Sequence, residues 1–101
     1  MQAAVLFHRL AAQEYRKARN WYAERSEEAA KRFRVATKAA VDRIASEGEA
    51  LPILTNQYRW VRVKKLPYIL IFRRRQDDEM LIVAVAHTSR RSSLLASPDL
   101  N

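Results

Sequence analysis

The stretch YRWVRVKKLPYILIFRRRQDDEMLIVAVAHTSRR, residues 58–91, carries the strongest strand signals in the chain. It contains two apolar runs rich in β-forming residues, Tyr68 to Phe72 and Met80 to Ala86, which seven residues separate. The separating segment begins with three arginines and ends with three acids. Because both runs are apolar on both sides of the pleat, they predict a hairpin of two central strands.

A basic strand is expected just before this hairpin. Strand alternation over residues 58–63 puts two sets of side chains on opposite sides, namely Arg59, Val61 and Val63 on one and Tyr58, Trp60 and Arg62 on the other. Residues 64–67 predict a turn, and a strand can begin at Pro67. Between Asn56 and Arg75 there are seven Lys or Arg and no acid. The sequence therefore predicts a three-stranded antiparallel meander that presents cations to an anionic partner.

Two helices are expected before the meander. Apolar residues recur from Ala11 to Tyr22 in steps of four, three and four, which predicts a helix over about Leu10 to Glu24. Ser26 followed by two glutamates is typical of a helix start, and the only glycine, Gly48, suits its end, so the second helix is expected over residues 27–47. Since the connection is short, the helices must form an antiparallel pair. Ten basic and seven acidic residues in the first fifty positions indicate a solvated charged surface on them.

The remaining segments complete an α+β fold. Ala3 to His8 reads as an N-terminal strand, and Ala50 to Gln57 as a connecting loop. After the last strand we expect Thr88 or Ser89 to cap a short C-terminal helical turn reaching about residue 96, with residues 97–101 frayed. The prediction is a strand, a helix hairpin and a meander forming one sheet.

The composition predicts a single domain over residues 1–101, with its core at about residues 3–91. It also predicts an anionic partner. A chain of 101 residues with 49% apolar residues can bury one core, and its net charge of +8 favours a polyanionic or acidic partner. There is no Cys, no secretory signal and no apolar run near ~18 residues, so we expect a cytoplasmic protein that makes no use of the membrane. No His, Asp and Glu cluster has metal spacing and no glycine-rich phosphate loop is possible, so no cofactor is expected.

One face of the expected sheet lacks cover. The helix pair can cover one face, and only Leu94, Leu95 and Leu100 remain for the other. We therefore expect either the C-terminal segment or a partner chain to lie over it.

The order of these segments resembles the RelE/ParE superfamily of bacterial type II toxins. The resemblance spans about residues 3–91 and is carried by three motifs: Trp21-Tyr22 late in the first helix, Leu66-Pro67-Tyr68 opening the third strand, and His87-Thr88-Ser89-Arg90 after the last. It implies the toxin of a plasmid-stabilising toxin–antitoxin pair. It also implies an antitoxin whose flexible, usually acidic segment wraps the toxin, in a heterotetramer or larger complex.

The superfamily holds two activities, and the motifs look more like ParE than RelE. RelE-like toxins cleave messenger RNA on the ribosome, and their third strand typically reads Tyr-Arg-x-x-Tyr. Here Ile69 stands at the Arg position and Phe72 at the second Tyr, and no Tyr, Glu or His follows Arg91. ParE-like toxins act on DNA gyrase, or its DNA complex, without a known catalytic constellation, and this is the function that the resemblance favours. A ribosome-dependent endoribonuclease and an inactive basic nucleic-acid-binding homologue remain the alternatives.

The predicted elements and the resemblance together give the candidate site residues. If the protein is a nuclease, its catalytic set is expected to be His87, Arg90, Arg91 and Arg59. Arginine forks suit carboxylates and phosphates equally, so contacts to an anion or a partner are expected at Arg59, Arg62, Arg73, Arg74, Arg75, His87, Arg90 and Arg91. The antitoxin groove is expected at Trp21, Tyr22, Trp60 and Tyr68, and Trp60 together with Tyr58 is expected to pack beneath the second helix.

Overall fold

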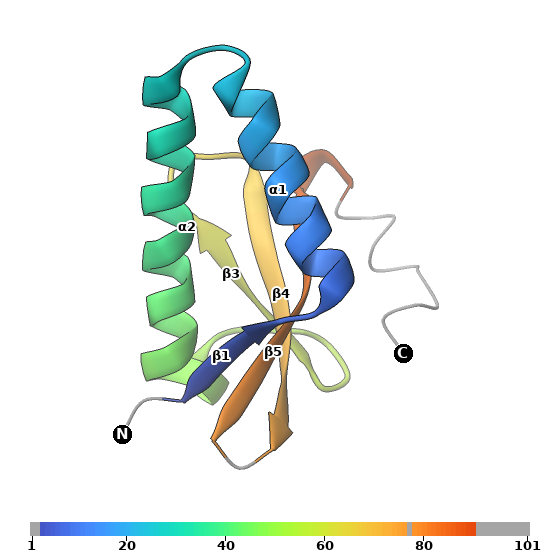
Figure 1. The fold of residues 1–101 in the computed structure, drawn as a ribbon. Helices are drawn as coiled ribbons and strands as arrows, with labels where there is room; N and C mark the ends of the chain where they lie inside the picture. Colours follow the sequence, from blue (N-terminus) through green and yellow to red (C-terminus); the bar gives the residue numbers. More distant parts are fainter. Residues whose placement is uncertain (1–2, 77, 91–101) are drawn as a thin grey trace.

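Two helices lie against one face of a five-stranded sheet in the computed structural model, which describes residues 3–76 and 78–90 (Figure 1). The elements in chain order are β1 (Ala4–Phe7), α1 (Arg9–Ala23), α2 (Glu27–Glu47), the 3-10 helix η1 (Gly48–Ala50), β2 (Ile53–Thr55), β3 (Tyr58–Val63), β4 (Tyr68–Gln76), β5 (Glu79–His87) and the 3-10 helix η2 (Thr88–Arg90). The strand order in the sheet is β1-β5-β4-β3-β2. The predicted α+β fold, with its N-terminal strand, helix hairpin and antiparallel meander, is confirmed.

The N-terminal strand joins the far edge of the meander. β1 pairs with β5 in parallel, and only over Glu79 to Ile82 of β5. The neighbouring pairs from β5 through β4 and β3 to β2 are all antiparallel. The second half of β5 therefore has β4 on one side and no strand of the described residues on the other.

The helix boundaries follow from side-chain caps. Ser26 Oγ accepts a hydrogen bond from Ala29 N at 2.9 Å, and His8 Nδ1 accepts one from Leu10 N at 3.1 Å. Each bond satisfies an amide that the first helical turn leaves without a partner. At the other end of α2, Gly48 has a φ of 45°, and a Cβ there would lie 3.0 Å from the Met80 side chain. A residue without a side chain is therefore required at this helix end.

The main core lies between the helices and the sheet. Ala11 of α1 and Ala40 and Ile44 of α2 pack with a set of strand residues that includes Leu70 and Phe72. The alanines let the helices approach the sheet closely, and α2 buries the apolar stripe expected from its sequence. The core thus fixes both helices on one face.

The opposite face of the sheet is also buried. Ile69, Ile71, Ala84 and Ala86 are each less than 10% exposed there, and Trp60 packs against them. The placement of Trp60 and Tyr58 beneath α2 is therefore wrong, because strand alternation puts both on the face that the helices do not cover. The leucines of the C-terminal segment, expected as cover, lie outside the described residues. Leu54, Trp60 and Val83 are partly buried around these four residues.

Two strand predictions need correction. The segment expected as a loop before β3 contains the short strand β2, whose register with β3 is irregular. The hairpin is also longer than expected, because β4 runs on to Gln76 and β5 begins at Glu79. Arg73, Arg74 and Arg75 are therefore strand residues. Within the described part of the chain, no helix is long and apolar enough to cross a membrane.

Candidate functional site

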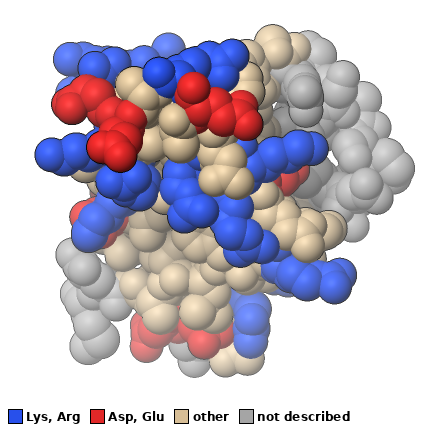
Figure 2. Space-filling view, turned by 45° about the horizontal axis from the view of Figure 1, so that its top comes forward, with Lys and Arg blue, Asp and Glu red and all other residues tan. Residues whose placement is uncertain are grey.

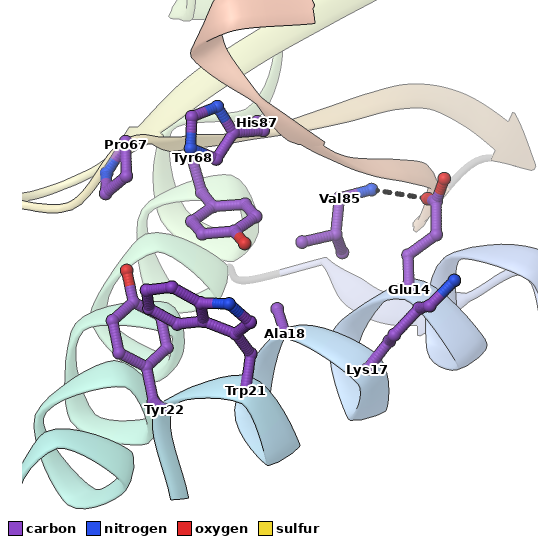
Figure 3. Close-up of a pocket in the computed structure, with 9 residues that line it drawn as sticks. All are labelled: Glu14, Lys17, Ala18, Trp21, Tyr22, Pro67, Tyr68, Val85 and His87. Atoms are coloured by element: carbon purple, nitrogen blue, oxygen red, sulfur yellow. Dashed lines mark hydrogen bonds between the residues drawn. The ribbon is translucent and has the colours of Figure 1, made fainter. Parts of the chain in front are cut away.

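A groove of about 440 Å³ runs between α1 and the adjoining ends of β4 and β5 (Figure 3). Helix α1 supplies one wall and the strands supply the other. The lining residues are Glu14, Lys17, Ala18, Trp21, Tyr22, Pro67, Tyr68, Val85 and His87. Three of the four residues expected to form a partner groove are among them, and Trp60 is not.

Aromatic rings anchored on Phe33 form the inner end of the groove. Phe33 of α2 is fully buried, and its ring stacks on Tyr22 at 5.2 Å between centroids. Tyr68 meets Phe33 edge-on at 5.6 Å, and His87 meets Tyr68 edge-on at 5.2 Å. Because one buried ring supports the others, the aromatic wall is preorganised rather than assembled on binding.

Trp21 is the exposed part of this wall. Its side chain is 47% exposed although the indole is largely apolar. The guanidinium of Arg25 lies 3.3 Å from the centre of the indole ring, and Arg25 Nη1 donates to the Trp21 carbonyl at 2.9 Å. Arg25 thus holds in place a large aromatic surface that solvent still reaches.

The strand side of the groove is an open edge of the sheet. Val85 lies opposite Leu70 of β4, and its amide bonds to a side chain of α1 on the other side of β5. Glu14 Oε1 accepts the hydrogen bond from Val85 N at 2.9 Å (Figure 3). A carboxylate from α1 therefore takes the place that the main-chain carbonyl of a neighbouring strand would take.

The pKa of one tyrosine in the groove, Tyr22, is shifted. Burial raises the pKa of the Tyr22 hydroxyl above its ordinary value of 10.0, and the nearby Tyr68 raises it further, while Arg25 lowers it. Tyr22 is therefore a neutral hydroxyl, able to donate and accept hydrogen bonds, throughout the physiological range.

Comparisons with known proteins agree with the fold and the motifs. The profile described as "ParE toxin of type II toxin-antitoxin system, parDE" matches residues 5–92 of the chain. The protein belongs to the ParE toxin family. A solved structure titled "Chromosomal ParDE TA system from P. aeruginosa" superposes with a TM-score of 0.60 at 16% identity, covering 84% of this chain and 95% of that chain. At this identity the match shows the fold alone, and no curated protein sequence matches.

Two members of the catalytic set expected of a nuclease, Arg59 and His87, lie on different strands of the sheet and far apart. His87 lies opposite Tyr68 at the start of β4, whereas Arg59 lies opposite Phe72 in its middle. Four residues of strand separate these positions by roughly 13 Å, and two strand spacings add to that distance. Arg59 Nη1 also donates to the Leu51 carbonyl at 2.8 Å. A reaction that needs both side chains at one phosphate is therefore not supported.

His87 is held locally. Its Nδ1 accepts a hydrogen bond from Ser89 N at 3.2 Å and lies 2.8 Å from Ser89 Oγ. No group of His, Asp and Glu able to hold a metal ion occurs in residues 3–76 and 78–90.

The arginines expected to contact an anion are dispersed. Arg74 pairs with Glu49 at 2.9 Å and Arg75 with Glu79 at 3.4 Å. Arg62 is exposed on β3, on the face away from the helices. The backbone of Arg90 lies in η2, and Arg91 lies outside the described residues. Closeness in the sequence therefore does not bring these cations to one site.

Five lining residues were missed by sequence reasoning, namely Glu14, Lys17, Ala18, Pro67 and Val85. Glu14 lies on a charged helix, and Val85 is an ordinary apolar strand residue. Their contact joins positions 71 apart in the chain. No local pattern reports such a contact, although a single acid on the sheet side of a basic helix is a weak signal for it.

Proposed function

We propose that the protein is a ParE-type toxin that inhibits DNA gyrase without catalytic groups of its own and is neutralised by a cognate antitoxin. Membership of the ParE toxin family supports the toxin class. The distance between Arg59 and His87 along β4 favours inhibition by binding over RNA cleavage. Relaxed or linearised plasmid is the expected product when gyrase is inhibited in this way.

The antitoxin is proposed to occupy the groove along β5. The observation that carries this proposal is the bond from Val85 N to Glu14 Oε1, which marks a strand edge without a strand partner. An extended segment can bond to such an edge through its main chain, and its side chains then select the partner. Lys17 and His87 lie in the same groove and suit an acidic segment.

The docking proposal makes Trp21 the leading anchor. Exposed aromatic residues at the centre of an interface are commonly binding hot spots. Trp21→Ala is expected to weaken antitoxin binding by roughly 30-fold or more, which corresponds to about 2 kcal/mol. Titration calorimetry with the protein encoded by the adjacent reading frame measures this effect.

Val35→Ala is the matched control for this experiment. Val35 is 62% exposed on α2 and lines neither the groove nor the second hollow described below. This variant is expected to bind the antitoxin like the unaltered chain. Equal losses in Trp21→Ala and Val35→Ala would place the antitoxin elsewhere.

The target requires a separate pair of assays. Purified gyrase is incubated with relaxed plasmid and the toxin, and a translation extract with the toxin is analysed for cut messenger RNA. Loss of supercoiling with intact message supports the proposal. Cut message with normal supercoiling would instead identify a ribosome-dependent nuclease, and no effect in either assay would indicate an inactive homologue.

A further inference from the structure

A second hollow, of about 500 Å³, lies between α1 and α2. Four cations line it: Arg16 and Arg19 from α1, and Arg34 and Lys38 from α2. No Asp or Glu of the described residues is among the side chains that line it. Figure 2 shows Lys and Arg side chains spread across the centre of the face that the helices form, with acidic side chains gathered mainly toward its ends.

The arginines around this hollow form no ion pair between described residues, although Arg19 lies 6.0 Å from the centre of the Tyr15 ring. Of its four cations, only Lys38 belongs to an ion pair between described residues, with Asp42 at 3.3 Å. Arg16 and Arg19 are three residues apart on one helix, and Arg34 and Lys38 are four apart on the other. Like charges at these spacings destabilise a helix slightly, so their placement has a cost that a bound anion would offset.

Two aromatic rings and one buried hydroxyl also line the hollow. Phe7 and Tyr15 line it and meet edge-on at 6.0 Å between ring centroids. Thr37 also lines the hollow, is 3% exposed, and its hydroxyl has no hydrogen-bond partner among the described residues. Buried hydroxyls are normally hydrogen-bonded, so the Thr37 hydroxyl is an exception beside the cations.

We propose that this hollow binds the phosphate group of an organic phosphate, with the guanidinium groups of Arg16 and Arg34 on its oxygens and the organic part against Phe7 and Tyr15. Arginine forks match phosphate oxygens in two-bond geometry. The volume lies within the range of roughly 300–1,000 Å³ that is usual for small-molecule sites. An extended acidic peptide would be matched by cations spaced along a track, whereas these four surround a single hollow.

This site is separate from the groove proposed for the antitoxin. The two hollows share no lining residue. Gyrase inhibition or antitoxin binding can therefore fail while phosphate binding holds, and the reverse is equally possible. The phosphate can belong to a free nucleotide or to the backbone of a nucleic acid.

The test is calorimetric titration of the full chain with AMP, with adenosine, and with a short single-stranded oligonucleotide. AMP is expected to bind more tightly than adenosine, which lacks the phosphate. The double variant Arg16→Ala/Arg34→Ala is expected to lower the affinity for AMP, or for the oligonucleotide, by roughly tenfold or more. Dependence seen with AMP identifies a free nucleotide as the ligand, and dependence seen with the oligonucleotide alone identifies a nucleic-acid phosphate.

Arg32→Ala is the control, because Arg32 is exposed on α2 and lines neither hollow. Circular dichroism and the midpoint of denaturant unfolding show whether each variant is folded. The proposal is overturned if neither phosphate probe binds, if adenosine binds as tightly as AMP, or if both variants lose affinity equally. Poly-glutamate is titrated in the same way. Binding of poly-glutamate alone would also overturn the proposal, because the site would then serve an acidic polypeptide.

Discussion

The two hollows beside α1 have opposite chemistry although one helix builds a wall of each. The groove along β5 combines aromatic rings with a strand edge that Glu14 caps, whereas the hollow toward α2 is surrounded by arginines. Residues 14, 17, 18, 21 and 22 of α1 line the first, and residues 12, 15, 16 and 19 line the second. A turn of 3.6 residues is therefore sufficient to give one short helix two recognition surfaces. The two proposals therefore assign a different ligand to each side of α1.

The largest expected effect comes from the buried ring that supports aromatic residues of both hollows. Phe33 stacks on Tyr15 at 5.4 Å beneath the cationic hollow and on Tyr22 at 5.2 Å beneath the groove. Phe33→Ala is expected to lower the free energy of unfolding by about 3–5 kcal/mol, because it leaves a cavity under both walls. Val35→Ala, two residues away and exposed, should change it by less than about 0.5 kcal/mol in the same urea titration. A loss near that of Val35→Ala would show that the two hollows do not depend on a common support.

A substitution of Glu14 tests the groove separately from the cationic hollow, because Glu14 lines only the groove. Glu14→Ala leaves the Val85 amide without its protein acceptor, so the isolated chain is expected to lose about 1–3 kcal/mol of stability. The same variant is expected to bind the antitoxin more tightly, because the incoming strand no longer displaces a carboxylate. AMP binding at the other hollow should not change. If stability and antitoxin affinity fall together, Glu14 is a direct contact of the antitoxin rather than a cap that it replaces.

The smallest expected effect is a pH dependence confined to the groove. Burial raises the pKa of Tyr22 in the folded chain above its ordinary value of 10.0, so the folded state holds this proton more strongly than the unfolded state. The associated stability is fully present below pH 10 and is lost as the pH rises through the folded-state pKa. Tyr22→Phe is therefore expected to show a shallower loss of stability above pH 10 than the unaltered chain. Identical slopes in denaturant titrations across this range would mean that Tyr22 ionises equally in both states.

The sequence predicts the scaffold better than the surfaces. The second helix was expected over the residues that it occupies, since Ser26 and Gly48 are local signals for its two ends. β2 was missed because it has three residues and follows Pro52, although Asn56, with a φ of 51°, is a typical turn residue between two strands. Local chemistry thus determines the helix ends, and a short edge strand depends on its neighbour.

The site residues were harder to predict than the fold, because a site depends on which face of the sheet or helix each side chain lies on. Alternation along β3 separates Trp60 from Val61 correctly, but it does not say which set lies under the helices. The arginine run of the hairpin was expected to contact an anion or a partner, and in the structure Arg74 pairs with Glu49 and Arg75 with Glu79. The arginines of the cationic hollow were assigned to a solvated surface, since only the packing of α1 on α2 brings them around one space.

The most direct test of the proposed antitoxin site is residue-resolved amide hydrogen exchange on the toxin alone and in complex with its antitoxin. Main-chain docking on β5 predicts slower exchange at Val85 and His87 in the complex, with little change at Val61 in the centre of β3. Slower exchange confined to α2, with Val85 and His87 unchanged, would contradict it.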